Sequence, residues 1–170
     1  ELGEPYSAPP VALDDVMQAE ERGDFAYDPR SNDSDPEGHA LVVSRINTSA
    51  TQGTASYTSS GITYNADGAF DSLAVGETGT DFIEYTVADR DQNTDTAQIT
   101  VQIAGLNNSP EASSDTATVR ADAGATALAL VANDSDVDHG DVLSVSEVSA
   151  TYAKGSVTLV SGTVWYTPNA

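Results

Sequence analysis

Apolar and polar residues alternate in short segments along the chain, and this pattern predicts β-strands. Residues 98–103 read Gln-Ile-Thr-Val-Gln-Ile, which places the Ile and Val side chains on one face. Residues 83–87 and 156–159 alternate in the same way. A period of two is expected of a strand with one buried face. Short strands separated by Gly, Asn and Asp favour an antiparallel sandwich, so we expect an all-β fold.

An internal repeat divides the chain. Residues 32–35, Asn-Asp-Ser-Asp, recur 101 positions later as residues 133–136. One added residue then changes the offset to 102, which pairs Gly38 with Gly140 and Tyr64 with Tyr166. The predicted organisation is a tail of a preceding segment at 1–8, a complete module at 9–105, a linker at 106–109 and a partial second module at 110–170.

Two segments contain enough Ala or Glu to suggest helices, residues 15–22 and 121–131. The repeat aligns them with each other, and Gly23 and Gly124 interrupt both. We therefore interpret them as edge strands and loops.

The second module has no counterpart of residues 69–103, and we expect it to lack the last two strands of its sandwich. Their absence leaves an open sheet edge and an open core. Either the sequence is cut from a longer protein, or another chain supplies the strands by donor-strand complementation.

Several motifs resemble those of bacterial cadherin-like repeats. Residues 131–138, Val-Ala-Asn-Asp-Ser-Asp-Val-Asp, resemble their acidic signature, and residues 166–168, Tyr-Thr-Pro, resemble their Tyr-x-Pro step. Residues 70–78 and 85–89 are similar to the closing half of the related VCBS repeats, and residues 107–110 to their linker. The motifs occur in the family's order along almost the whole chain.

The resemblance implies a seven-stranded Greek-key sandwich of the cadherin/Ig-like type, arranged in tandem modules. It also implies large secreted, RTX-like adhesins, biofilm proteins or polysaccharide-degrading enzymes as parents, with Ca²⁺ between or beside modules. The chain departs from the pattern at Arg90 and Gln92, where these repeats usually have Asp-Gly-Asn-Gly. This departure weakens that turn as a ligand loop.

The charge balance narrows the choice of partners. The chain has 27 Asp and Glu against 6 Lys and Arg, a formal net charge of -21. Such a chain lacks the bases needed to neutralise nucleic-acid phosphates or an anionic membrane surface, and it favours a cationic partner such as a metal ion. No apolar run reaches the length of a membrane span, so we expect no membrane insertion. A secretion signal is expected to lie outside this segment.

Each module carries a loop in which acids alternate. The predicted Ca²⁺ ligands in these two loops are Asp33, Asp35, Glu37, Asp134, Asp136 and Asp138. Carboxylates two residues apart in an extended loop point the same way, and without a cation they repel one another. An EF-hand is rejected because the twelfth positions are Ser44 and Val145 rather than Glu. The alternative is that these acids are solvated turn formers.

Three further residues are predicted metal ligands: Asp89, Asp91 and Asn107. We expect them to share a pole with the acidic loop of the next module, so that one ion ties two modules together. The two histidines, His39 and His139, are interpreted as exposed turn residues, and the alternative is an occasional transition-metal ligand.

No Cys nucleophile or Gly-x-Ser-x-Gly motif occurs, and we predict that the chain is not an enzyme. Trp165 lies between Val164 and Tyr166, whose counterparts are core positions, so it faces the other side of its strand. It either packs under a neighbouring loop or forms a platform for a sugar ring or partner.

These features together predict a non-enzymatic extension module of a secreted or cell-surface bacterial adhesin, stiffened by Ca²⁺ and supporting cell adhesion or biofilm formation. Its partners are neighbouring modules of the same polypeptide, another adhesin copy or a polysaccharide. The alternative is an accessory carbohydrate-binding module of an extracellular polysaccharide-active enzyme, with Trp165 in its ligand site.

Overall fold

The computed structural model describes residues 7–151 and 153–169, and its regular structure is almost all β. Most of the tail expected at 1–8 lies outside the described residues. The chain divides into two compact units, Glu1–Asn107 and Asn108–Ala170, which we call module one and module two.

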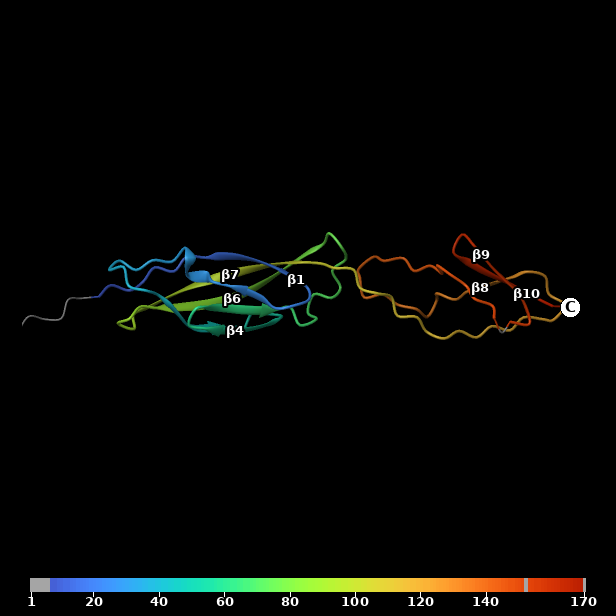
Figure 1. Cartoon of the computed structure of the whole chain (residues 1–170), viewed down its shortest axis with the longest axis horizontal. Coiled ribbons are helices and arrows are strands. Elements are labelled where there is room, and N and C mark those ends of the chain that lie inside the picture. Colours follow the sequence, from blue (N-terminus) through green and yellow to red (C-terminus); the bar gives the residue numbers. More distant parts are fainter. Residues whose placement is uncertain (1–6, 152, 170) are drawn as a thin grey trace, which may run out of the picture. The chain divides into compact units, whose positions relative to one another are not determined.

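Module one is a sandwich of two sheets (Figure 1). The four-stranded sheet has the order β1-β7-β6-β3, and the three-stranded sheet has the order β2-β5-β4. The strands are β1 (Asp15–Glu20), β2 (Phe25–Tyr27), β3 (Val42–Asn47), β4 (Thr54–Thr58), β5 (Gly61–Asn65), β6 (Thr78–Ala88) and β7 (Thr94–Ala104). Strand β1 pairs with β7 in parallel, whereas the other neighbours are antiparallel. A single 3-10 turn, η1 (Pro29–Ser31), connects β2 to the acidic loop before β3. The expected β-sandwich is confirmed.

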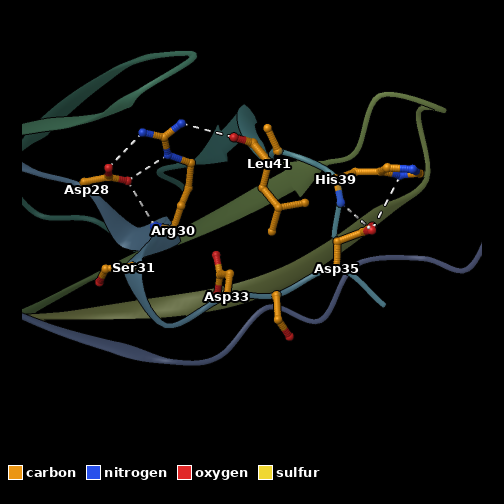
Figure 2. Close-up of a pocket in the computed structure, with 9 residues that line it drawn as sticks. Asp28, Arg30, Ser31, Asp33, Asp35, His39 and Leu41 are labelled. Atoms are coloured by element: carbon orange, nitrogen blue, oxygen red, sulfur yellow. Dashed lines mark hydrogen bonds and ion pairs between the residues drawn. The ribbon is translucent and has the colours of Figure 1, made fainter. Parts of the chain in front are cut away.

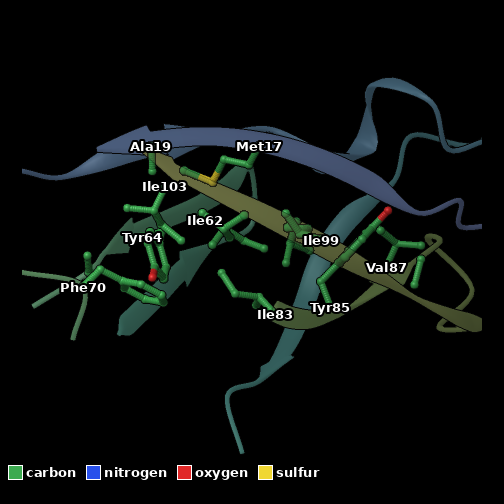
Figure 3. Packing of buried hydrophobic residues seen from close by; sticks show 14 residues of the cluster. Met17, Ala19, Ile62, Tyr64, Phe70, Ile83, Tyr85, Val87, Ile99 and Ile103 are labelled. Carbon is green, nitrogen blue, oxygen red and sulfur yellow. The ribbon is translucent and has the colours of Figure 1, made fainter. Parts of the chain in front are cut away.

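The core lies between the two sheets and uses every second residue of the long strands (Figure 3). In β6 and β7 the alternating residues Ile83, Tyr85, Ile99 and Val101 are each 0% exposed. Burying a side chain of this size stabilises the fold by about 1.5–3 kcal/mol. The alternation in the sequence therefore marks the inward face of both strands.

A buried carboxylate fastens the two sheets together. Asp81 is 0% exposed on β6, and it accepts hydrogen bonds from the Tyr64 hydroxyl at 2.8 Å and from the backbone N–H groups of Gln52 and Gly53 at 2.9 Å. A buried charge is tolerated where several donors surround it. We interpret this group as structural, because it is fully buried between the two sheets and bridges them through hydrogen bonds.

Module two repeats the smaller sheet of module one. Its strands β8 (Thr126–Leu128), β9 (Gly155–Val160) and β10 (Thr163–Pro168) have the order β8-β10-β9, which corresponds to β2-β5-β4. An isolated bridge between Glu111 and Ser135 matches the one between Val11 and Ser34. Within the described residues, module two has no sheet that corresponds to β1-β7-β6-β3.

Neither segment with a helix-like composition is helical. Residues 15–22 contain β1 at the edge of its sheet, and residues 121–131 contain a turn followed by β8, again at an edge. The interpretation as edge strands and loops is confirmed. Because β1 lies against β7, its alternating Met17 and Ala19 are buried despite the helix-favouring composition.

Candidate cation-binding loops

The first acid of each loop is held by the protein itself. Asp33 Oδ1 accepts the backbone N–H of Leu13 at 2.8 Å, and the Tyr85 hydroxyl lies 3.0 and 3.1 Å from the two carboxylate oxygens. Burial raises the pKa of Asp33, although these hydrogen bonds oppose the shift. In module two, Asp134 likewise accepts the backbone N–H of Ser113 at 2.8 Å. Asp33 and Asp134 therefore fasten the start of each module to its loop.

The second acid of the loop in module one has an unmet oxygen. Asp35 Oδ1 accepts the backbone N–H group of Glu37 at 3.0 Å. It also accepts the backbone N–H group of His39 at 2.9 Å (Figure 2). The Asp35 side chain is 0% exposed, and its Oδ2 has no hydrogen-bond partner among the described residues. A buried polar atom without a partner costs about 1–3 kcal/mol, and more when it is charged. This oxygen can therefore accept a hydrogen bond or bind a cation.

His39 lies between this loop and the β6–β7 turn. Its Nδ1 is 3.5 Å from Asp35 Oδ1 and 3.6 Å from Asp91 Oδ2, and its side chain is 12% exposed. The interpretation of His39 as an exposed turn residue is therefore wrong. The sequence does not show this contact, because the turn that covers His39 is about fifty residues away along the chain.

The β6–β7 turn brings two more acids to the same place. Asp89 accepts both the backbone N–H and the side-chain Nδ2 of Asn93 at 2.8 Å. Burial raises the pKa of Asp89, but the hydrogen bonds from Asn93 outweigh it and hold the pKa below its ordinary value. Ligand atoms of His39, Asp89 and Asp91 lie within 4.8 Å of one another, as do those of Asp35, Glu37 and His39. We call these five residues the module-one pole.

The expected grouping of Asp89 and Asp91 with Asn107 is wrong. Both acids lie at the end of β6, whereas Asn107 follows the far end of β7. Strand β7 has 11 residues, which corresponds to about 35 Å at the usual rise of a strand. The carbonyl of Asn107 accepts a hydrogen bond from Arg22 at that distant end.

Module two forms a smaller acidic group at the matching loop. Ligand atoms of Asp136, Asp138 and Asp141 lie within 4.8 Å of one another, and we call these residues the module-two pole. Asp138 is 5% exposed and accepts the backbone N–H and side-chain Nδ2 of Asn108 at 2.8 and 2.9 Å. The alternation of acids identified Asp136 and Asp138 as candidates. Asp141 joins them only because the loop turns back, with the Asp141 N–H donating to the Asp138 carbonyl at 3.4 Å.

The donor chemistry of both poles fits a divalent cation. Carboxylate oxygens are the preferred ligands of Ca²⁺, and a site needs several of them. The Asp35 Oδ2 atom, which has no hydrogen-bond partner among the described residues, leaves the module-one pole able to accept a further donor or a cation.

Trp165 lies on the exposed face of the three-stranded sheet β8-β10-β9 in module two. It is 37% exposed, whereas Val164 beside it is 3% exposed, so the expected orientation on the strand is correct. Its cross-strand neighbours are the small residues Ala127 and Thr158. Among the described residues, no helix is long and apolar enough to cross a membrane.

Comparisons with known proteins give a family. A sequence model of the bacterial cadherin-like domain matches residues 7–105, and one of the cadherin-like domain matches residues 106–170. No curated protein matches the chain.

Two solved structures are similar at low identity. One, from Saccharophagus degradans, is a nucleoside hydrolase-related hypothetical protein associated with carbohydrate metabolism; it is 19% identical over 59% of this chain and 26% of that chain, with a TM-score of 0.38. The other is the human Desmocollin-1 ectodomain, 12% identical over 96% of this chain and 32% of that chain, with a TM-score of 0.45. This chain thus spans about a quarter to a third of each. On the strength of the family models, the chain belongs to the bacterial cadherin-like domain family.

Proposed function

We propose that this chain is a non-enzymatic extension segment of a secreted or cell-surface adhesin, in which divalent cations, Ca²⁺ above all, stabilise the acidic loops. Cadherin-like domains commonly mediate adhesion, and the family assignment therefore supports this role. The observation that carries the proposal is the pair of homologous acidic poles, one of which contains a fully buried carboxylate oxygen without a partner.

Both poles hold the chain that enters their module. Glu37 accepts the backbone N–H of Ala8 at 3.2 Å, and Asp138, its counterpart in the repeat, accepts that of Asn108 at 2.8 Å. A cation bound to these carboxylates therefore acts on the segment that leads into the module. By fixing that segment, the cation reduces the freedom of the module relative to what precedes it, which is how a tandem array is stiffened.

Electrostatics makes the effect depend on the cation. The net charge of -21 and the crowding of carboxylates at each pole leave mutual repulsion that a divalent cation removes. A cation that binds only the folded module stabilises it by mass action, by about 2.7 kcal/mol at one hundred times the Kd. Extracellular modules bind Ca²⁺ with a Kd on the order of 10⁻⁴–10⁻³ M, so millimolar Ca²⁺ is the relevant range.

The test is a Ca²⁺ titration of the full chain, followed by the spin relaxation of backbone amides in each module. Ca²⁺ is expected to bind, and the motion of the modules relative to each other is expected to slow. Asp141→Asn is the informative variant, because Asp141 is exposed and its loss should remove a ligand without unfolding the module. Unchanged relaxation at several times the Kd would reject the stiffening role.

A second candidate is the carbohydrate-binding module, which rests on Trp165. An indole that stands 37% exposed among small neighbours offers a flat surface on which a sugar ring stacks. Glycan-array binding that is lost in Trp165→Ala but kept in Tyr57→Ala, an exposed tyrosine of module one, would favour it. Equal glycan binding by the two variants, or no glycan binding by the unmodified chain, would reject the carbohydrate-binding role.

A further inference from the structure

The last candidate ligand of the acidic loop differs between the two modules. Gly38 and Gly140 occupy the same place in the repeat, and both have positive φ, 74° and 86°. Aligning these two glycines places His39 opposite Asp141, while His139 becomes the added residue of the longer loop. The same loop thus presents an imidazole nitrogen in module one and a carboxylate oxygen in module two.

His39 is positioned as a ligand. Its Nδ1 is buried without a hydrogen-bond partner among the described residues. The separations of 3.5 Å to Asp35 Oδ1 and 3.6 Å to Asp91 Oδ2 exceed the usual length of a hydrogen bond. They are close to the spacing of about 3.4 Å between two ligands that bind one tetrahedral ion at about 2.0–2.1 Å.

A second observation points to the same place. Asp35 has a fully buried side chain, and its Oδ2 is also without a partner among the described residues. Its Oδ1 is fixed by two backbone N–H groups, which hold the carboxylate in one orientation. A ring nitrogen and a carboxylate oxygen, neither with a hydrogen-bond partner among the described residues, therefore lie on neighbouring side chains of one preorganised cluster.

We propose that the module-one pole is a site for a borderline divalent transition metal, best fitted by Zn²⁺, with ligands from His39 Nδ1, Asp35 and Asp91. Imidazole together with carboxylate suits Zn²⁺, whereas an all-oxygen set suits Ca²⁺. The module-two pole, with its three aspartates, remains the Ca²⁺ site. The inference rests on the proposed function only in that both poles hold cations.

The experiment is a titration of the full chain with ZnCl₂ and, separately, CaCl₂, by calorimetry and by the side-chain ¹⁵N resonances of the two histidines. Zn²⁺ is expected to shift the His39 ring nitrogens and not those of His139. The variant His39→Asp, which gives module one the pattern of module two, should lose at least about tenfold in Zn²⁺ affinity, or about 1.4 kcal/mol. The control His139→Ala should change it less than about twofold, since that residue is outside the pole.

The outcomes separate this inference from the proposed function. Zn²⁺ binding that survives His39→Asp, or that falls equally in His139→Ala, overturns the Zn²⁺ site. Absence of Zn²⁺ binding by the unmodified chain also overturns it. The histidine resonances need no variant, so they decide the question even where His39→Asp does not fold. Ca²⁺ binding that is lost in Asp141→Asn reports on the proposed function alone.

Discussion

The hydroxyl of Tyr85 is predicted to contribute substantially to the free energy of unfolding of module one. Tyr85 is 0% exposed on β6, and its hydroxyl lies 3.0 Å from both Asp33 Oδ1 and the Leu13 carbonyl. Burial raises the pKa of Tyr85, so the group stays a donor at every physiological pH. Tyr85→Phe removes this donor, so the Asp33 carboxylate and the Leu13 carbonyl each lose a hydrogen-bond partner.

The magnitude follows from the charge of the acceptor. A hydrogen bond to a charged group contributes about 1.5–3 kcal/mol. For a domain of this size, 1 kcal/mol corresponds to roughly 4–8 °C in Tm, so Tyr85→Phe should lower the Tm of module one by about 6–24 °C. Differential scanning calorimetry of the full chain measures this directly.

The matched control is Tyr57→Phe, at a tyrosine of β4 that is 44% exposed. Its effect on the free energy of unfolding should stay within about 0.5 kcal/mol. A double-mutant cycle with Asp33→Asn should show coupling between Tyr85 and Asp33. If Tyr85→Phe cost no more than the control, Asp33 would not be held by Tyr85.

Three further predictions concern the same module. Asp81→Ala should destabilise it by about 3–5 kcal/mol, because the Tyr64 hydroxyl and two backbone N–H groups lose their acceptor. The loss should exceed that caused by Tyr64→Phe, and equal losses of unfolding free energy in urea would contradict this prediction. Burial raises the pKa of Asp15, whose Oδ2 has no partner among the described residues, so the folded state binds this proton more tightly than the unfolded state. The Asp15 contribution to stability is then present below the ordinary pKa and lost as pH rises through the raised value. Asp15→Asn should therefore become more stable relative to the unmodified chain as the pH rises above the ordinary pKa of Asp, and a pH-independent difference in unfolding free energy would refute it. Chelation with EDTA should lower the Tm of the unmodified chain more than that of Asp35→Asn, and an equal loss in both would show that Asp35 holds no ion.

Much of the fold was predictable because strands of a sandwich bury alternate residues. The runs around Ile83 and Ile99 have that period, and both strands occur as expected. The repeat was visible because the acidic motif and the later apolar positions keep one register. Residues 144–149 have the pattern of β3 but form no strand. Within the described part of module two, no strand corresponds to β6, which pairs with β3 in module one.

The candidate site was only half predictable. Acids that alternate in one loop are visible in the sequence, so Asp35, Glu37, Asp136 and Asp138 were identified. His39 lies close to Asp91 because the turn between β6 and β7, about fifty residues later in the chain, covers it. The spacing of residues around His39 therefore could not predict this contact. The different roles of the acids within one loop also depend on tertiary contacts. Asp33 accepts a hydrogen bond from Tyr85, whereas Asp35 keeps an oxygen without a hydrogen-bond partner among the described residues.

The most direct test of the cation account is a calorimetric melt of the full chain in chelator and in Ca²⁺ at about one hundred times the Kd. Stabilisation of about 2.7 kcal/mol is expected for a module with one site, which corresponds to a rise in the Tm of module two by roughly 10–20 °C. The rise should disappear in Asp141→Asn. Identical melting curves in chelator and in saturating Ca²⁺ would contradict the account.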